Sequence, residues 1–230
     1  MKKYKHIYFD LDCTLWDFKS NSREALHTIF NRYGLFKKID DFDLFVEKYA
    51  VHNERLWEAY RRGRVKKAEL RVTRFNNTLK DFGIKDIELA KLIDADYIIE
   101  SPCGRHLVPH ATDLLDYLNG KYFLYIVTNG FKDVQYVKME TSGLLNYFSK
   151  VFTSDEIGYP KPDKRFFKEA LSFVNAGKQE SLVVGDDLEI DIIGARNYGI
   201  DQVYFNPAFL PHNEIVTYEV GSLEEIKDIL

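Results

Sequence analysis

The sequence has few of the features that mark secreted, membrane-spanning or disulfide-stabilised proteins. Its 230 residues include only two cysteines, Cys13 and Cys103, which are too few for a disulfide framework and suggest a reducing compartment. No stretch reaches the roughly 18 apolar residues that a membrane-spanning helix needs. Charged residues between positions 5 and 12 interrupt any apolar run of signal-peptide length near the N-terminus. We therefore expect a cytoplasmic protein without a membrane partner.

An excess of positive charge is also missing. The chain has 32 Lys and Arg against 36 Asp and Glu, a net charge of −4, so its composition gives no reason to expect a nucleic-acid partner. A small anionic ligand would need local positive charge or a metal ion. The hydrophobic content of 45% and the charged content of 30% are typical of a globular protein, built as one large domain or as one domain with an insertion.

Two carboxylates that follow an apolar run form the first candidate site. Residues 7–9 are apolar and β-prone, and Asp10, Asp12 and Thr14 follow at alternate positions. Side chains two residues apart on an extended backbone point the same way, so Asp10 and Asp12 would face one point. Like charges at that spacing repel each other unless a cation lies between them or one carboxyl keeps its proton. The pattern predicts a metal or acid/base site, and the alternative is an acidic turn that closes a strand.

Four helical patterns follow, with no convincing strand between them. Asn21 and Glu24 resemble a capping box at the start of the first helix, which stops at Gly34. The other three helices are expected over residues 41–62, 68–82 and 86–100. Together they predict an amphipathic helical bundle.

The third of these helices carries two different faces. Its expected buried stripe consists of Ala68, Val72, Phe75, Leu79 and Phe82. The neighbouring flank is basic and includes Lys67, Arg71 and Arg74. A basic flank is ordinarily a solvated helix face, and the alternative is that its arginines meet an anionic ligand.

The second half of the chain alternates between strand and helix patterns, which indicates βαβ units and a parallel sheet. Strands are expected at residues 122–127, 150–152, 181–184, 202–205 and 215–220. The first strand pairs naturally with this half. We therefore expect an α/β fold, with a Rossmann-like parallel sheet core and helices on both faces, made by residues 1–15 and 102–230. Residues 16–101 would be an inserted α-helical bundle.

Polar residues also follow three of the later strands, where open α/β folds bind their ligands. Thr128 and Asn129 end one strand, and the backbone there can present N–H groups to an anion. Lys161 lies between two prolines that stiffen its loop. Three acidic residues follow the buried strand at 181–184, namely Asp186, Asp187 and Asp191. Charged carboxylates next to a buried strand are energetically costly unless a cation or a hydrogen-bond donor meets them. Taken singly, these motifs are also compatible with an ordinary turn or a surface lysine.

In the order Asp-x-Asp-x-Thr, Thr-Asn, Lys and Gly-Asp-x-x-x-x-Asp, these residues resemble the four motifs of the haloacid dehalogenase-like hydrolases. The resemblance implies that Asp10 is the nucleophile that takes up a phosphoryl group, and that Asp12 is the acid/base that protonates the leaving oxygen. It also implies that Thr128 and the Asn129 N–H grip the phosphate, while Lys161 neutralises its charge. Attack on a phosphate dianion requires such neutralisation.

The same resemblance implies a Mg²⁺ cofactor. Its ligands would be the Asp10 carboxylate, the Asp12 backbone carbonyl and Asp186. Asp191 would hold metal-bound water or the loop lysine. Asp187 departs from the family pattern, in which a small polar residue is common at that position. The choice of direct ligand between Asp186 and Asp187 therefore stays open, with the other residue expected near the ion.

The position of the helical insertion, between the first and second motifs, corresponds to the α-helical cap of the phosphatase, phosphomutase and dehalogenase branches. Asp12 argues against a dehalogenase, because those enzymes lack the second Asp. A closer resemblance, over residues 15–18, 53–61, 69–75 and 151–156, is to the YjjG-type 5′-nucleotidases. It implies hydrolysis of a small phosphorylated metabolite, a (deoxy)nucleoside monophosphate, and we expect a monomer or homodimer.

This function leaves alternatives within and outside the family. A phosphoglycolate or sugar phosphatase and a phosphomutase would use the same motifs, and a catalytically silent binding protein would keep the fold without the reaction. If the function is a nucleotidase, the residues expected to contact the nucleotide from the cap are Trp57, Arg71 and Arg74.

Overall fold

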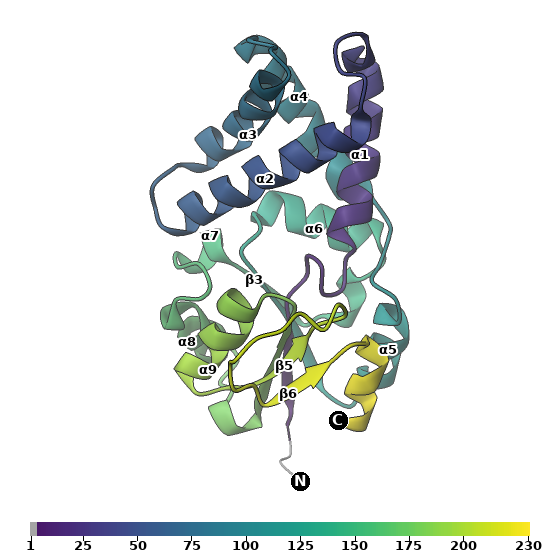
Figure 1. The fold of residues 1–230 in the computed structure, drawn as a ribbon. Coiled ribbons are helices and arrows are strands. Elements are labelled where there is room, and N and C mark those ends of the chain that lie inside the picture. Colours follow the sequence, from purple (N-terminus) through teal and green to yellow (C-terminus); the bar gives the residue numbers. More distant parts are fainter. Residues whose placement is uncertain (1–3) are drawn as a thin grey trace. The chain divides into compact units, whose positions relative to one another are not determined.

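The computed structural model describes residues 4–230, and the chain divides into two compact units (Figure 1). The α/β unit consists of Met1–Phe18 and Arg105–Leu230, and the helical unit is Lys19–Gly104. The chain thus passes from one unit to the other after residues 18 and 104. The boundaries expected from the sequence lie after residues 15 and 101.

A six-stranded sheet, parallel throughout, forms the centre of the α/β unit, which confirms the expected fold class. Its strands are β1 (His6–Phe9), β2 (Phe123–Thr128), β3 (Lys150–Thr153), β4 (Ser181–Gly185), β5 (Asp201–Phe205) and β6 (Tyr218–Val220). They lie in the order β3-β2-β1-β4-β5-β6. The winding direction reverses between β1 and β4, and ligands of open α/β sheets bind at such a point.

Helices cover both faces of this sheet, because successive strand residues point to opposite sides. On β1, Ile7 and Phe9 join one apolar core and Tyr8 joins the other. The first core is completed by α5 (Ala111–Leu118), α6 (Lys132–Thr141) and the 3₁₀ turns Leu223–Asp228, and the second by α8 (Lys164–Phe173) and α9 (Gly194–Tyr198) (Figure 1). The remaining short helical turns of this unit are α7 (Ser154–Ile157), Leu145–Tyr147, Lys178–Glu180 and Leu188–Ile193.

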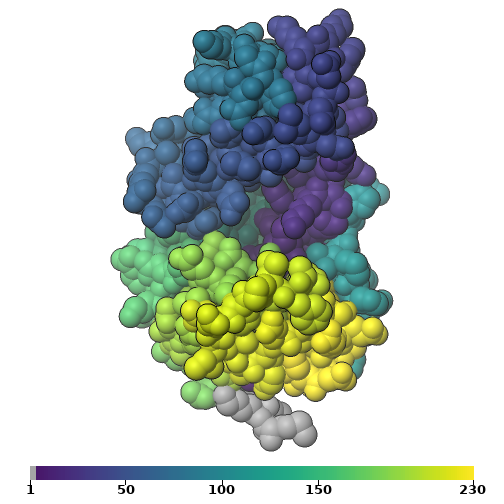
Figure 2. All heavy atoms as spheres, viewed as in Figure 1, coloured from purple at the N-terminus to yellow at the C-terminus, as the bar shows by residue number. Residues whose placement is uncertain are grey.

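Between β5 and β6 the chain has little regular structure, and β6 and the turns Leu223–Asp228 follow. Drawn in yellow, this part of the chain forms a continuous surface on the near side of the α/β unit (Figure 2). The Asn206 side chain accepts a hydrogen bond from the Leu210 N–H at 2.9 Å and donates one to the Leu210 carbonyl at 3.0 Å. These bonds fix the loop by satisfying its backbone without a helix.

Four long helices form the helical unit. They are α1 (Phe18–Arg32), α2 (Phe42–Arg61), α3 (Lys67–Asp81) and α4 (Ile87–Glu100). A short turn at Leu35–Lys37 lies between α1 and α2, and another at Ser101–Cys103 follows α4. Asp41 and Asp86 cap α2 and α4, since their carboxylates accept the N–H groups of Leu44 and Leu89. The core of this unit combines aliphatic residues with several aromatic side chains, among them Phe45, Tyr49, Phe75 and Tyr97.

Two expectations for these helices need correction. The first helix begins at Phe18 rather than at Asn21, and Asn21 is buried where its side chain lies against Gly104. The expected stripe of α3 is wrong only at Ala68, which is exposed, because Phe75 and Leu79 are buried and Val72 and Phe82 pack against the core. The buried face also includes a charged residue, Arg74, which a hydrophobic pattern does not anticipate.

Arg74 can be buried because the helical unit satisfies its guanidinium. That group lies 3.2 Å from the Asp94 carboxylate and donates to the Tyr49 hydroxyl at 3.2 Å and to the Asn53 side chain at 3.1 Å. It also lies over the Tyr97 ring, 4.9 Å from its centre. Burial raises the pKa of Asp94, and Arg74 opposes that rise. The expectation that Arg74 lies on a solvated flank is therefore wrong.

We expect Arg74→Ala to destabilise the protein by about 3–5 kcal/mol, because it leaves Asp94 buried without its cation. Urea unfolding measures the change. The matched control is Arg32→Ala, because Arg32 also pairs with two carboxylates of this unit, Asp96 and Glu100, but is exposed. Loss of such an exposed pair has little effect on stability. Equal unfolding midpoints for the two variants would contradict the structural role of Arg74.

Candidate active site

The two central strands bring the first and last motifs together. The Phe9 position of β1 pairs with Val184 of β4, and the Asp10 N–H donates to the Val184 carbonyl at 2.8 Å. Asp10 directly follows β1, and Asp186 directly follows β4. Both carboxylates therefore lie at the carboxyl edge of the sheet, where the winding reverses.

A cluster of three carboxylates occupies this edge. Asp10, Asp186 and Asp191 each offer a carboxylate oxygen, and these oxygens lie within 4.8 Å of one another. Asp191 comes from the π-helical turn Leu188–Ile193, whose geometry is frequent at functional sites. Gly185 makes room for it, because a Cβ at this glycine would lie 2.4 Å from the Asp191 Oδ2 atom.

The ammonium group of Lys161 lies inside this cluster. Its Nζ atom is 2.6 Å from Asp10, 2.6 Å from Asp191 and 2.8 Å from the Val127 carbonyl, so all three of its donors are used. The side chain is only 1% exposed. Burial disfavours the charged form of Lys161, but the attraction of Asp10 and Asp191 raises its pKa above the ordinary value. This lysine is therefore a fixed positive charge.

One ammonium group does not balance three carboxylates. Burial, together with repulsion from neighbouring carboxylates, raises the pKa of Asp10 well above its usual value although Lys161 opposes the shift. Burial also raises the pKa of Asp191, and burial and the charge of Asp191 raise the pKa of Asp186 to about 7. Oxygen ligands that carry uncompensated negative charge suit a hard divalent cation such as Mg²⁺. The residues thus fit a metal ion.

Thr128 and Asn129 lie where β2 ends. The Asn129 side chain accepts the Lys161 N–H at 2.8 Å and donates to the Lys161 carbonyl at 3.0 Å. This pair of bonds fixes the loop that carries the lysine. The Thr128 hydroxyl oxygen accepts from the Gly130 N–H at 3.0 Å and from the Gln135 amide at 2.7 Å. Its own hydroxyl proton can still point to a ligand.

Two residues that the sequence did not single out contact Asp12. Lys138 Nζ lies 2.5 Å from Asp12 Oδ1, and Gln135 Nε2 lies 2.9 Å from Asp12 Oδ2. Both side chains come from α6 and are buried. Their sequence signal was available, because Gln135 and Lys138 share a buried helix face with Met139, where an apolar residue is expected.

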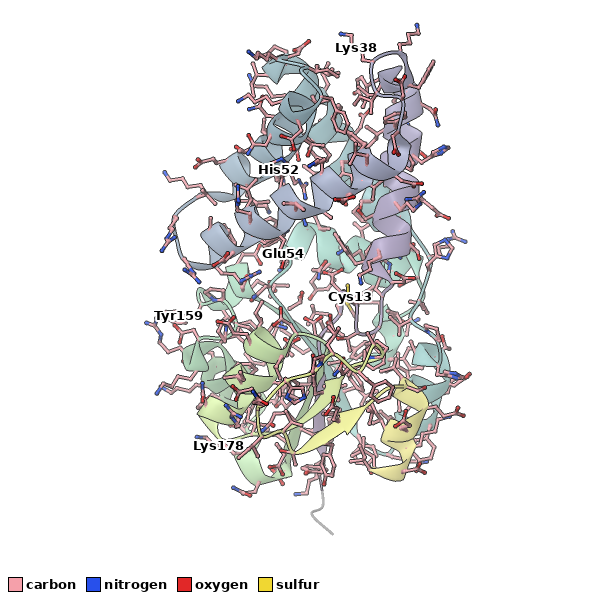
Figure 3. The ribbon with its side chains drawn as sticks, viewed as in Figure 1. Cys13, Lys38, His52, Glu54, Tyr159 and Lys178 are labelled. Carbon is pink, nitrogen blue, oxygen red and sulfur yellow. The ribbon has the colours of Figure 1, made fainter. Side chains whose placement is uncertain are left out.

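The other residues near this edge have structural contacts. The Thr14 hydroxyl donates to Asp186 at 3.0 Å and orients that carboxylate. Asp187 accepts the N–H groups of Glu189 and Ile190 at 3.0 and 2.9 Å and caps the turn that follows β4. Cys13 is half-buried on the loop after β1 (Figure 3).

The sequence matches a known family model over most of its length. The model of the haloacid dehalogenase-like hydrolases covers residues 4–199. The chain belongs to this family. It is therefore a hydrolase, as the resemblance of its motifs implies, and this family in general uses Mg²⁺.

Relatives in this family span the full chain. The HAD-hydrolase YfnB of Bacillus subtilis is 33% identical over 100% of this chain and 97% of its own length. The pyrimidine 5′-nucleotidases PynA of Streptococcus pneumoniae and YjjG of Escherichia coli are 34% and 32% identical over 99% of this chain, and over 95% and 98% of theirs. A crystal structure of YfnB bound to magnesium has a TM-score of 0.90 at 31% identity and covers 99% of both chains. The resemblance to YjjG-type hydrolases is confirmed.

The residues expected to give this hydrolase its specificity lie in the helical unit. Trp57 and Tyr60 of α2 are half-buried and meet edge to face, with ring centres 5.7 Å apart. Arg71 of α3 is also half-buried, whereas the donors of Arg74 are used within the unit. Among residues 4–230, none of the helices combines the length and apolar character needed to cross a membrane.

The raised pKa of Asp186 predicts a pH-dependent stability of the metal-free hydrolase. The folded state keeps the Asp186 proton, which the unfolded state loses near the ordinary pKa of 3.8. The stability that this proton provides is therefore full below pH 3.8 and is lost as pH rises through about 7. With a chelator present, we expect wild type to lose about 2 kcal/mol relative to Asp186→Asn between pH 5 and pH 8.

Urea unfolding of both proteins at the two pH values measures this difference. Asp187→Asn is the control, because Asn also caps a helical turn. A difference between wild type and Asp186→Asn that stays constant with pH would contradict the shifted pKa.

Proposed function

We propose that this hydrolase is a Mg²⁺-dependent phosphomonoesterase that acts on nucleoside monophosphates and carries the phosphoryl group transiently on Asp10. The observation that carries the proposal is the cluster of Asp10, Asp186 and Asp191, in which Asp10 and Asp191 are buried and bind Lys161, with Asp12 two residues beyond Asp10. Such a set of charges suits a phosphate dianion and a divalent cation together, and neither a structural role nor binding alone requires it.

In this mechanism the phosphate is held by positive charge and N–H groups. Lys161 is fixed by Asp191 and by the Asn129 clamp on its backbone, so its ammonium group is preorganised beside Asp10. The Thr128 hydroxyl and the Asn129 N–H are assigned to the phosphate oxygens. Mg²⁺ bound by Asp10, the Asp12 carbonyl and Asp186 would supply the remaining charge neutralisation.

The proposed chemistry proceeds in two steps. An Asp10 oxygen attacks phosphorus, the bond from phosphorus to the ester oxygen breaks, and Asp12 gives its proton to that oxygen. Water then attacks the phosphorus of the aspartyl phosphate, the bond between phosphorus and the Asp10 oxygen breaks, and Asp12 takes up one proton of the water. The products are the alcohol and inorganic phosphate, and Asp10 and Asp12 return to their starting states.

Asp186 rather than Asp187 is assigned to the ion. Asp186 belongs to the carboxylate cluster, whereas an oxygen of Asp187 already accepts two backbone N–H groups. Asp191 is assigned to Lys161, because the two groups are 2.6 Å apart and both are buried. These contacts support a division of labour in which one acidic residue binds metal, one fixes the lysine and one caps a turn.

Support for a nucleotide substrate comes from the relatives that span the chain. Both PynA and YjjG are named pyrimidine 5′-nucleotidases. Relatives named glyceraldehyde 3-phosphate phosphatase align with only about half of this chain. We assign substrate choice to the helical unit as a cap, with Trp57 and Arg71 as the residues that contact the nucleotide.

Removal of the nucleophile tests the core of the proposal. Asp10→Asn keeps the shape of the side chain but cannot form the acyl phosphate, so we expect no detectable phosphate release from p-nitrophenyl phosphate with Mg²⁺. Excess EDTA is expected to abolish wild-type activity, and Asp186→Asn to raise the Mg²⁺ concentration needed for half-maximal rate. Asp187→Asn is the control and is expected to keep the wild-type Mg²⁺ requirement. An active Asp10→Asn protein, or full activity in EDTA, would rule out this mechanism.

Substrate choice is tested with a panel of nucleoside monophosphates, sugar phosphates and phosphoglycolate, with phosphate release as the readout. We expect pyrimidine nucleoside monophosphates to have the highest kcat/KM. We also expect Arg71→Ala to raise KM for them by about tenfold, the loss of one charge-assisted contact, and to leave p-nitrophenyl phosphate unchanged. Arg62→Ala, at the exposed position directly after α2, is the control. Faster hydrolysis of a sugar phosphate than of every nucleotide would overturn the nucleotidase assignment while leaving the phosphatase intact.

A further inference from the structure

The carboxylate of Asp12 is held by a helix that belongs to none of the sequence motifs. Lys138 and Gln135 of α6 each donate to a different oxygen of this carboxylate, at 2.5 and 2.9 Å. Two donors on two oxygens fix both the position of the carboxylate and the rotation of its plane. A single contact would leave the rotation free.

Both donors are themselves fixed by neighbouring residues. The Lys138 ammonium group lies 4.4 Å from the centre of the Trp16 ring and 5.7 Å from that of Phe18, which is the geometry of a cation–π contact. The Gln135 amide also donates to the Thr128 hydroxyl at 2.7 Å. Neither donor can follow a moving carboxylate without losing these contacts, so the carboxylate takes the orientation that they define.

Stability alone does not explain this arrangement. The Lys138 side chain is 5% exposed, whereas that of Asp12 is 29% exposed and in reach of water. Burying an ammonium group to pair it with a carboxylate that water can solvate gives little net stability, because desolvation offsets the attraction. A pair with this cost is expected where the geometry of the carboxylate matters.

We propose that Lys138 and Gln135 are positioning residues that hold the Asp12 carboxyl where it can protonate the leaving oxygen. The inference rests on the proposed phosphatase mechanism. In the first step the protonated Asp12 carboxyl gives its proton to the ester oxygen as the bond between that oxygen and phosphorus breaks. Lys138 keeps all of its protons. Lys138 and Gln135 act through Asp12 and make no contact with the reacting atoms. Correct orientation of a proton donor accounts for much of its effect on rate.

The test compares two aryl esters of similar shape. Phenyl phosphate releases a poor leaving group that needs protonation, whereas p-nitrophenyl phosphate releases a stable phenolate that needs little. The variant is Lys138→Met, which keeps most of the length of the side chain but removes the donor and its charge. Because kcat/KM reports only the steps up to the first irreversible one, it isolates the transfer to Asp10 from the later hydrolysis.

We expect Lys138→Met to lower kcat/KM for phenyl phosphate by about 10- to 100-fold and for p-nitrophenyl phosphate by less than about threefold. Lys138→Arg keeps a charged donor and is expected to restore most of the loss. Gln135→Met removes the other hydrogen bond and is expected to change the ratio of the two kcat/KM values in the same direction. Lys168→Met, at an exposed position on α8, removes the same charge and is the control.

Each outcome distinguishes a positioning role of Lys138 from a purely structural one. Equal losses for both esters, or no loss for either, would show that Lys138 contributes only to stability and would overturn the inference. If Lys138→Met does not fold, as judged by circular dichroism, an unchanged ratio in Gln135→Met overturns it instead. Wild-type protein that hydrolyses neither ester in Mg²⁺ would refute the proposed phosphatase itself, a result distinct from failure of the positioning role.

Discussion

The buried Lys161 ammonium group is the interaction on which the site depends. It joins Asp10 at the end of β1, Asp191 beyond β4 and the Val127 carbonyl of β2. Three adjacent strands are thus connected through one side chain at their carboxyl edge. A charge this deeply buried is tolerated only with full pairing, so the geometry of the edge is strongly constrained. One ammonium group still cannot balance the three clustered carboxylates, of which Asp186 lies outside its hydrogen bonds, and this is why the edge suits a metal ion.

Local backbone features make that edge possible. Gly185 has no Cβ, and Asp191 occupies the space where one would lie. The π-helical turn after β4 returns Asp191 to the sheet, while Asp187 caps the turn. The Asn129 side chain holds the backbone on both sides of the lysine. Together these features fix the distance between the Lys161 ammonium group and Asp10, the proposed nucleophile, as in-line phosphoryl transfer requires.

The helical unit solves a similar electrostatic problem in a different way. Arg74 and Asp94 are both buried there, and the guanidinium group is surrounded by the hydroxyl and rings of Tyr49, Phe75 and Tyr97. Because Arg74 donates to partners inside the helical unit, the Arg74–Asp94 pair organises the core of that unit. Arg71, one turn away on α3, is only half-buried and is the arginine of this helix to which we assign ligand recognition.

The sequence by itself determined the parallel sheet, the helical insertion and the strand ends at which the acidic residues lie. These follow from short-range patterns, because polar residues placed directly after buried strands must meet at one edge of the sheet. Only the tertiary structure decided which buried polar residues pair with one another. Arg74 on the buried face of α3, and Lys138 and Gln135 on that of α6, contact partners 20 to 126 positions away in the chain. No helical period encodes those contacts, because the cost of burying a charge is offset by a partner that only the folded chain brings into reach.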